Sequence, residues 1–484
     1  MEPTRQRALV VSSVFTETEM AAKLGREAYS YRFVFQAFEP LLRRWGPTVE
    51  VTRPESRLDY ALLRARQQNL EPIHLSFLPL HMTYLAHGAP NIAVPAWEFP
   101  DIPNRDFQNN PRNNWLRIAD QLSVIMTHCH ITRNAFLRAG VKPPVHLVPV
   151  PIPPEYFQVP PWERSQRVVL DCPCYVFPQP ESAREIQPNP WLAASTTSAS
   201  LKEKARQAYK GYVKPRLPSG VHKSVTLAVR AVRAMRTARA EEVRVPFPVS
   251  PKLELSGVVY STIFNPYDPR KNFQDMLSAY LLALGDCEDA TLVIKLVLCP
   301  ELSAVALKNM IHYYLGLGLR HRCKLVFVNA FLPDELMVEL ARASTYYLNT
   351  SRAEGSCLPL QNYLAAGRPG VAPAHTGMAD YLDDDIGFTI ACHPEPAGWP
   401  HDPEHRFTTT WQRLVWWSLH NQLRNSYEVA RKDRALYQAM GLRGRQRLAA
   451  FAGAESVWPP LAAALDAAKA SVLRTPASTE PVAA

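Results

Sequence analysis

The segment 347–382, YLNTSRAEGSCLPLQNYLAAGRPGVAPAHTGMADYL, restricts the possible fold of this chain more than any other part of the sequence. It begins with a short apolar run and continues through a polar turn that contains Glu354 and Gly355. A helical pattern with Pro359 in its first turn follows, and then a second apolar run at 371–373 and another glycine turn. Consecutive strand–turn–helix units of this kind are typical of α/β folds.

The turn at Glu354 and Gly355 also suggests a binding site. A helix N-terminus has backbone N–H groups without partners and the positive end of the helix dipole, so it favours a bound phosphate. Pro359 fits the first helical turn because its missing N–H would have no partner there. An ordinary α/β turn with a glycine has the same spacing, so the pattern alone leaves both interpretations open.

The same segment resembles the donor loop of retaining nucleotide-sugar glycosyltransferases with the GT-B fold, Glu-Gly-Phe-Gly-Leu-Pro-x-x-Glu before a helix ending Ala-x-Gly-x-Pro. The matching residues are Glu354, Gly355, Leu358, Pro359, Ala366, Gly367 and Pro369. Ser356 and Cys357 replace the middle pair of the motif, and Asn362 stands in place of its second glutamate. The resemblance implies an α/β protein with two Rossmann-like domains facing a central cleft.

A second strand–turn–helix unit begins at 257–264 and continues with NPYDPRKN. The helix predicted after it has apolar residues at helical spacing from Phe273 to Leu284. Arg270 and Lys271 therefore stand at a helix N-terminus, where they could neutralise a diphosphate or form a solvated surface pair. In the glycosyltransferases, basic residues at this place bind the donor diphosphate.

The resemblance also implies the roles of individual residues. Glu354 is the expected catalytic residue, beside the donor sugar and the anomeric carbon. The motif's second glutamate accepts hydrogen bonds from the ribose, and Asn362 has only one uncharged acceptor oxygen for this role. The loss of one charge-assisted bond would cost about 1–2 kcal/mol of donor binding. The expected donor-binding residues are Asn265, Arg270, Lys271, Gly355, Ser356, Cys357, Leu358 and Asn362.

The first third of the chain alternates between apolar runs and helical patterns, which predicts a parallel sheet with crossover helices. The expected strands are 8–12, 73–80, 91–95, 122–127 and 146–151. The segments PAWEFPDIP and SVIMTHCHITRNAFLRAGVKPPVHLVPVPI resemble parts of the acceptor domain of the same enzymes. This resemblance implies that Glu98 and His130 lie on the acceptor side. The Gly-Gly loop that usually follows the first strand is absent, and the turn reads SSVFTE.

Five parts of the chain are expected. They are an N-terminal Rossmann-like domain at 1–153, a proline-rich basic insertion at 154–251, a C-terminal Rossmann-like domain at 252–402, crossover helices at 403–466 packing back on the N-terminal domain, and a disordered tail at 467–484. In the fourth part, 407–423 and 426–440 are predicted to be long helices.

Positive charge is concentrated in one segment. The formal net charge is +10, and 201–245 contains twelve Lys or Arg residues against three Glu. An amphipathic pattern within it could pack on the protein itself, lie on an anionic membrane surface or, less in keeping with its few aromatic residues, bind nucleic acid. The sequence has no leader and no apolar run of 18 residues, so we expect a cytoplasmic protein, peripheral on the inner face of the membrane if 201–245 binds lipid.

Neither a metal site nor a cofactor is expected. The eight cysteines are scattered apart from Cys172 and Cys174, and no second Cys/His pair follows at a zinc spacing. His128 and His130 flank Cys129, a pattern that is more often structural than ligating.

Two functions follow from these observations. The first is a metal-independent retaining glycosyltransferase that transfers a sugar from a nucleotide-diphosphate sugar to a glycan or lipid-linked acceptor in bacterial cell-surface polysaccharide synthesis. The second is a degenerate glycosyltransferase that acts as a sugar-nucleotide-binding or scaffold subunit. Asn362 and the missing Gly-Gly loop motivate the second.

Overall fold

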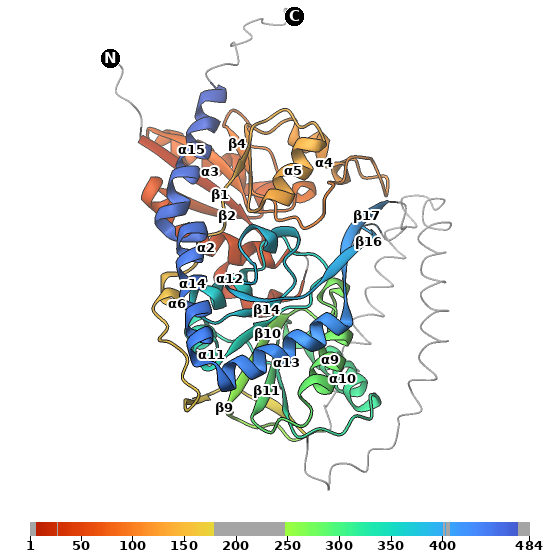
Figure 1. Ribbon diagram of the computed structural model, residues 1–484. Coiled ribbons are helices and arrows are strands. Elements are labelled where there is room, and N and C mark those ends of the chain that lie inside the picture. The colour runs from red at the N-terminus through yellow and green to blue at the C-terminus, as the bar shows by residue number, and fades with distance from the viewer. Residues whose placement is uncertain (1–5, 27, 179–246, 400–401, 403–406, 473–484) are drawn as a thin grey trace, which may run out of the picture. The chain divides into compact units, whose positions relative to one another are not determined.

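A computed structural model describes residues 6–26, 28–178, 247–399, 402 and 407–472 (Figure 1). Both central sheets belong to one compact unit, made of Met1–Pro178, Val249–Ser303 and Leu319–Ala484. A second unit consists of Gln179–Pro248 and Ala304–Gly318. The basic segment 201–245 and the end of the chain after residue 472 lie outside the described residues.

The N-terminal half is built on a six-stranded parallel sheet, as the alternating pattern predicted. Its order is β2-β1-β3-β4-β5-β6. The strands are β1 (Gln6–Ser13), β2 (Thr48–Thr52), β3 (Leu70–Ser76), β4 (Asn91–Ala93), β5 (Val124–Thr127) and β6 (Val145–Leu147). Only the edge strand β2 was not predicted, because only one of its five residues is buried and they contain no apolar run. The connecting helices include α2 (Ser30–Trp45), α3 (Pro54–Gln67) and α5 (His130–Arg138).

The C-terminal half is built on a seven-stranded sheet with the order β15-β14-β13-β10-β11-β12-β8. The strands are β8 (Cys174–Phe177), β10 (Val258–Phe264), β11 (Ala290–Leu296), β12 (Lys324–Val328), β13 (Tyr346–Leu348), β14 (Gly370–Ala372) and β15 (Gly387–Thr389). All neighbours are parallel except β12 and β8. The helices that connect the parallel strands are α9 (Phe273–Leu284), α10 (Pro300–Gly316), α11 (Asp334–Ala343) and α12 (Leu358–Ala365). Strand order reverses at β10 and β13, which is where α/β sheets bind ligands.

Part of the predicted insertion belongs to the C-terminal sheet. β8 lies within 154–251 but pairs with β12 as an antiparallel edge strand. Next to it, β7 (Arg167–Leu170) pairs with β9 (Leu253–Ser256) across the end of the insertion. β7 and β9 form a separate two-stranded sheet, and its buried apolar residues pack in one cluster with those of β10, β11 and β12.

The C-terminal region differs from the prediction at its start. The prediction that 407–423 is one helix is wrong, because β17 (Thr408–Leu414) forms a hairpin with β16 (Cys392–Gly398) before α13 (Trp416–Lys432) begins. Three threonines in TTTWQRL favour a strand, and the apolar residues further along suggested a helix. The second predicted helix extends over α13 and α14 (Arg434–Ala452), with a break at Asp433.

The last helix alone lies in the N-terminal core. α13 contacts α9 and α14 contacts α12, both in the C-terminal half. By contrast, Val457, Leu461 and Leu465 of α15 (Ala454–Val472) are buried in the same cluster as the apolar face of α2. α15 continues to Val472, so 467–472 is helical and not part of a tail. Repeated alanines, which favour helix, explain this extension.

One described segment, Arg434–Lys469, is long and apolar enough to cross a membrane by length and composition. It consists of α14 and most of α15, separated at Gly453. Buried side chains of both helices, such as Leu448 and Leu461, pack in the protein's own apolar clusters. Core helices pass the same test of length and composition, so this segment is weak evidence for a span.

Candidate active site

The turn after β10 is shaped by local side-chain caps. Asn265 accepts a hydrogen bond from the backbone N–H of Tyr267 at 3.0 Å. Asp268 caps the short 3-10 turn Pro269–Lys271 by accepting from the backbone N–H of Arg270 at 3.1 Å. Arg270 and Lys271 thus lie in a capped turn directly before α9, close to the position that the sequence predicted.

This turn is joined to the loop after β13. The backbone N–H of Arg352 donates to the carbonyl of Arg270 at 2.7 Å. The hydroxyl of Thr350 donates to the carbonyl of Lys271 at 3.0 Å. Because β10 and β13 are neighbours in the sheet, the two loops lie side by side and bring Lys271 to Glu354.

Glu354 and Lys271 form a buried ion pair. Lys271 Nζ lies 2.5 Å from Glu354 Oε1, and the two side chains are 19% and 9% exposed. Asn349 Nδ2 lies 3.5 Å from the same oxygen. Burial raises the pKa of Glu354, but the charges of Lys271 and Arg270 outweigh it, so the pKa is below its usual value. Burial opposes the charged form of Lys271 too, and Glu354 nevertheless raises its pKa. The two residues are therefore ionised together.

The backbone of Glu354 is held by residues after β14. Its N–H donates to Thr376 Oγ1 at 3.0 Å, and Thr376 Oγ1 lies 3.1 Å from His375 Nδ1. His375 Nε2 lies 3.0 Å from the carbonyl oxygen of Ser351. Because a carbonyl only accepts, Nε2 donates and Nδ1 accepts from the Thr376 hydroxyl. Burial lowers the pKa of His375 to about 4, so the imidazole is neutral at neutral pH. The two hydrogen bonds then select its tautomer.

Two glycines make a close backbone contact beside Glu354. A Cβ on Gly377 would lie 1.8 Å from the carbonyl oxygen of Gly355, so no other residue fits at position 377. The N–H of Gly377 donates to the carbonyl of Glu354 at 2.9 Å. A Cβ on Gly355 would meet the carbonyl oxygen of Trp97 at 3.1 Å. The loop at Glu354 and Gly355 is thus packed between the segment that follows β14 and the N-terminal half.

Arg270 links the two halves through carboxylates. Its guanidinium binds Asp268 at 2.6 and 3.0 Å and also contacts Glu98, which comes from the N-terminal half. Together with Lys271 and Glu354, the cluster contains three carboxylates and two cations. Burial raises the pKa of Glu98 to about 7, with the negative charges of Asp268 and Glu354 adding to the rise and the charge of Arg270 opposing it. Burial and one excess negative charge in the cluster explain why Glu98 takes up a proton most easily.

The N-terminus of α12 keeps donors available. The backbone N–H groups of Gly355, Ser356, Cys357 and Leu358 donate to no acceptor among the residues that the structure describes. Other atoms of Ser356, Cys357 and Leu358 already have contacts within the protein. The carbonyl of Ser356 accepts from Gln361 and Tyr381, and the Cys357 thiol lies 2.9 Å from Asn349 Nδ2. Leu358 packs against the N-terminal core.

Two predicted site residues make no direct contact with this cluster among the described residues. The Asn362 side chain lies close to the phenol of Tyr156 and lowers its pKa, which burial raises. His130 begins α5, where its N–H donates to Asp380 at 2.8 Å and its Nδ1 lies 3.2 Å from the same carboxylate oxygen. Both residues therefore already have partners within the chain, and the structure does not bring them to Glu354.

Sequence reasoning missed the residues that support the cluster. Asp268 had a detectable signal, because Asp-Pro before a basic pair is a typical start of a helical turn. Asn349, His375 and Thr376 had none, since each contacts Glu354 or its neighbours only through tertiary structure. No group of three or more His, Cys, Asp or Glu side chains that could hold a metal ion occurs in the described parts of the chain.

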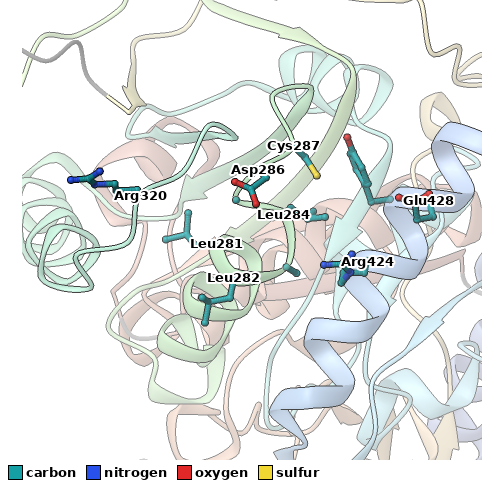
Figure 2. A pocket seen from close by; sticks show the side chains of 11 residues that line it. Leu281, Leu282, Leu284, Asp286, Cys287, Arg320, Arg424 and Glu428 are labelled. Carbon is teal, nitrogen blue, oxygen red and sulfur yellow. The ribbon is translucent and has the colours of Figure 1, made fainter.

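A surface pocket of about 320 Å³ lies elsewhere, between the C-terminal end of α9 and α13 (Figure 2). Asp286, Arg320, Arg424 and Glu428 are among the residues that line it. Because Lys271 precedes the N-terminal end of α9, whose 12 residues span about 18 Å, this pocket is remote from the cluster. The charge cluster is the stronger candidate site because its ionisable groups are buried and paired across loops.

Comparison with known proteins gives the fold. No family model matches the sequence, and no curated protein matches it at a significant level. Among solved structures, the chain is similar to sucrose-phosphate synthase from Thermosynechococcus elongatus, with a TM-score of 0.50, 13% identity and coverage of 96% of this chain and 100% of that one. It is also similar to a glycosyltransferase from Rickettsia africae, with a TM-score of 0.50, 9% identity and coverage of 97% and 99%. The expected GT-B fold is confirmed.

Proposed function

We propose that this protein is a glycosyltransferase that transfers a sugar from a nucleotide-diphosphate sugar to a glycan or lipid-linked acceptor with retention of configuration. The observation that carries the proposal is the buried Lys271–Glu354 pair in front of the unpaired N–H groups of α12. A cation and free N–H donors suit a diphosphate, and a carboxylate beside them suits the hydroxyls of a sugar.

The proposed reaction needs charge neutralisation more than any other contribution. When the bond between the anomeric carbon and the diphosphate breaks, negative charge grows on the leaving group and positive charge on the sugar ring. Lys271, Arg270 and the N–H groups of 355–358 would stabilise the leaving diphosphate. Glu354 would bind the sugar hydroxyls and support the positive charge at the anomeric carbon. These groups can carry the neutralisation without a metal ion, which is why we propose a metal-independent reaction.

The acceptor would approach from the N-terminal half, which contributes Glu98. Donor binding must separate Arg270 and Lys271 from part of their contacts with carboxylates, because the diphosphate competes for the same cations. Glu98 is the carboxylate that loses least by this, since its raised pKa of about 7 lets it take up a proton more easily than the others. Released from Arg270, it could accept a hydrogen bond from an acceptor hydroxyl.

The wider setting is also a proposal. We place the activity in the cytoplasm, in bacterial cell-surface polysaccharide or glycoconjugate synthesis, with 201–245 as a peripheral contact to an anionic membrane. The positive charge of that segment supports the membrane contact. Neither a cofactor nor nucleic acid takes part.

Activity measurements on two variants test the proposal. Donor hydrolysis or transfer with a panel of nucleotide sugars should be lost in Glu354→Gln and Lys271→Ala. Glu335→Gln on the exposed face of α11 is the matched control and should keep full activity. Full activity in both site variants would disprove the proposed roles.

A degenerate, donor-binding protein is the second candidate, and the Asn362 contact favours it. Asn362 lies close to the phenol of Tyr156 and lacks the charge that would hold the ribose. Calorimetry followed by product analysis separates the two candidates. Binding of a nucleotide sugar without any turnover, in the presence of varied acceptors, would favour this second function.

A further inference from the structure

Lys295 is a buried cation that the proposed mechanism does not use. It stands near the C-terminal end of β11 and is 4% exposed. It forms no ion pair or hydrogen bond with any residue that the structure describes, and its ammonium is not fully enclosed. Burial lowers the pKa of Lys295 to about 8. A buried ammonium without a partner costs free energy, so the position calls for an explanation outside folding.

The sheet register determines which face Lys295 occupies. Lys295 is level with Ile263 on β10 and with Val328 on β12. Ile263 packs against the cluster that contains Tyr347 of β13 and Leu360 of α12. Val328 packs in the cluster that includes buried residues of α11. Side chains level with each other on neighbouring parallel strands share a face. Lys295 therefore stands on the face covered by α11 and α12, at the carboxyl edge of the sheet.

This edge also carries the candidate active site. The register of β13 on β10 places Asn349 level with Ile263, and Asn349 contacts Glu354. Neighbouring strands are about 4.8 Å apart, so the backbone of Lys295 lies two spacings, or about 10 Å, from that of Asn349. No charged group in the cluster affects the pKa of Lys295, which agrees with such a separation.

The other directions along this edge are filled. On the side of β14, Gly377 and Gly355 are in backbone contact, and His375 and Thr376 are hydrogen-bonded to the donor loop. Along α12, the side chain of Asn362 lies close to the phenol of Tyr156. A diphosphate bound in front of α12 thus has its attached nucleoside directed past β10 toward β11.

We propose that Lys295 is a further donor-binding residue, whose ammonium donates hydrogen bonds to oxygen atoms of the nucleotide portion of the donor. The proposal rests on the proposed function, since it assumes that the sugar lies at Glu354 and the diphosphate at Lys271. The oxygen atoms could belong to the α-phosphate or to the ribose and base. In each case Lys295 supplies part of the nucleotide contact for which Asn362 is poorly suited.

Calorimetry on the full chain tests the assignment. Wild type is first titrated with the diphosphates of uridine, guanosine, adenosine and thymidine, and the tightest is kept. Its nucleoside, its monophosphate and inorganic pyrophosphate are then compared in wild type, Lys295→Met and Lys295→Gln. Lys324→Met, at the exposed start of the adjacent strand β12, is the matched control. Melting temperatures without ligand monitor folding.

We expect both Lys295 variants to bind the diphosphate and monophosphate about 10- to 100-fold more weakly. Weaker binding of the nucleoside with unchanged pyrophosphate binding assigns the contact to ribose or base, and unchanged nucleoside binding with weaker pyrophosphate binding assigns it to the α-phosphate. The melting temperature should stay equal or rise, because an unpaired charge is removed. Unchanged diphosphate binding, or a lower melting temperature in both variants, overturns the assignment alone. A wild type that binds no nucleotide overturns the proposed function together with it.

Discussion

Lys271→Met tests whether the buried pair with Glu354 exists in solution. The substitution keeps the length of the side chain and removes its charge, leaving a carboxylate that is 9% exposed without its cation. Breaking a buried ion pair from one side costs about 3–5 kcal/mol. Glu354 can limit this cost by taking up a proton. With an ordinary pKa of 4.5, protonation at pH 7 costs about 3.4 kcal/mol, from 2.5 units at 1.36 kcal/mol each. We therefore expect a loss of about 3 kcal/mol at pH 7.

The stability difference between wild type and Lys271→Met should depend on pH. In wild type the pKa of Glu354 is lowered, so its contribution to stability is present above pH 4.5 and is lost as the pH falls through the folded-state pKa. In Lys271→Met the carboxyl is neutral in the folded protein, so the variant gains relative to wild type as the pH falls. The difference in the free energy of unfolding between wild type and Lys271→Met should shrink to about 0.7 kcal/mol at pH 5.

Urea unfolding followed by circular dichroism at pH 5, 6, 7 and 8 measures these differences. Lys324→Met is the control for loss of an exposed lysine. The double variant Lys271→Met with Glu354→Gln should be more stable at pH 7 than Lys271→Met alone, because residue 354 then has no carboxylate that must be protonated. Equal unfolding midpoints for wild type and Lys271→Met at pH 7 would refute the reasoning.

Three further outcomes are expected. The Kd of the tightest nucleoside diphosphate should be lower at pH 6 than at pH 8, because Glu98, with a pKa of about 7, is neutral below that pH and gives up Arg270 more easily. Glu98→Gln should abolish this pH dependence. An equal Kd of the wild type at both pH values contradicts the expectation. Gly377→Ala should lower the melting temperature by several degrees, since overpacking costs about 1–3 kcal/mol or more, and an unchanged melting temperature would rule out the 1.8 Å contact. Deletion of 201–245 should reduce cosedimentation with anionic vesicles, and undiminished cosedimentation would exclude this segment as a membrane contact.

Much of the fold could be predicted because local patterns repeat. Apolar runs of strand length alternate with helical spacing in both halves, and this alternation is sufficient for parallel sheets with crossover helices. β2 escaped prediction because an edge strand needs few apolar residues. β8 and β17 were missed for a related reason, since pairing with distant partners determines their structure. Thr408–Leu414 has helix-compatible residues and becomes a strand only because β16 lies beside it.

The sequence by itself determined the chemistry of the candidate site. A glutamate before a helix N-terminus and a basic pair after an earlier strand are local features, and they identified Glu354, Arg270 and Lys271 as residues to examine together. Only the tertiary structure decided how these charges are used. Glu98, far away in the chain, contacts Arg270, and the shared buried environment raises its pKa to about 7. Burial and charge pairing depend on what surrounds a side chain in space, and spacing along the chain does not contain that information.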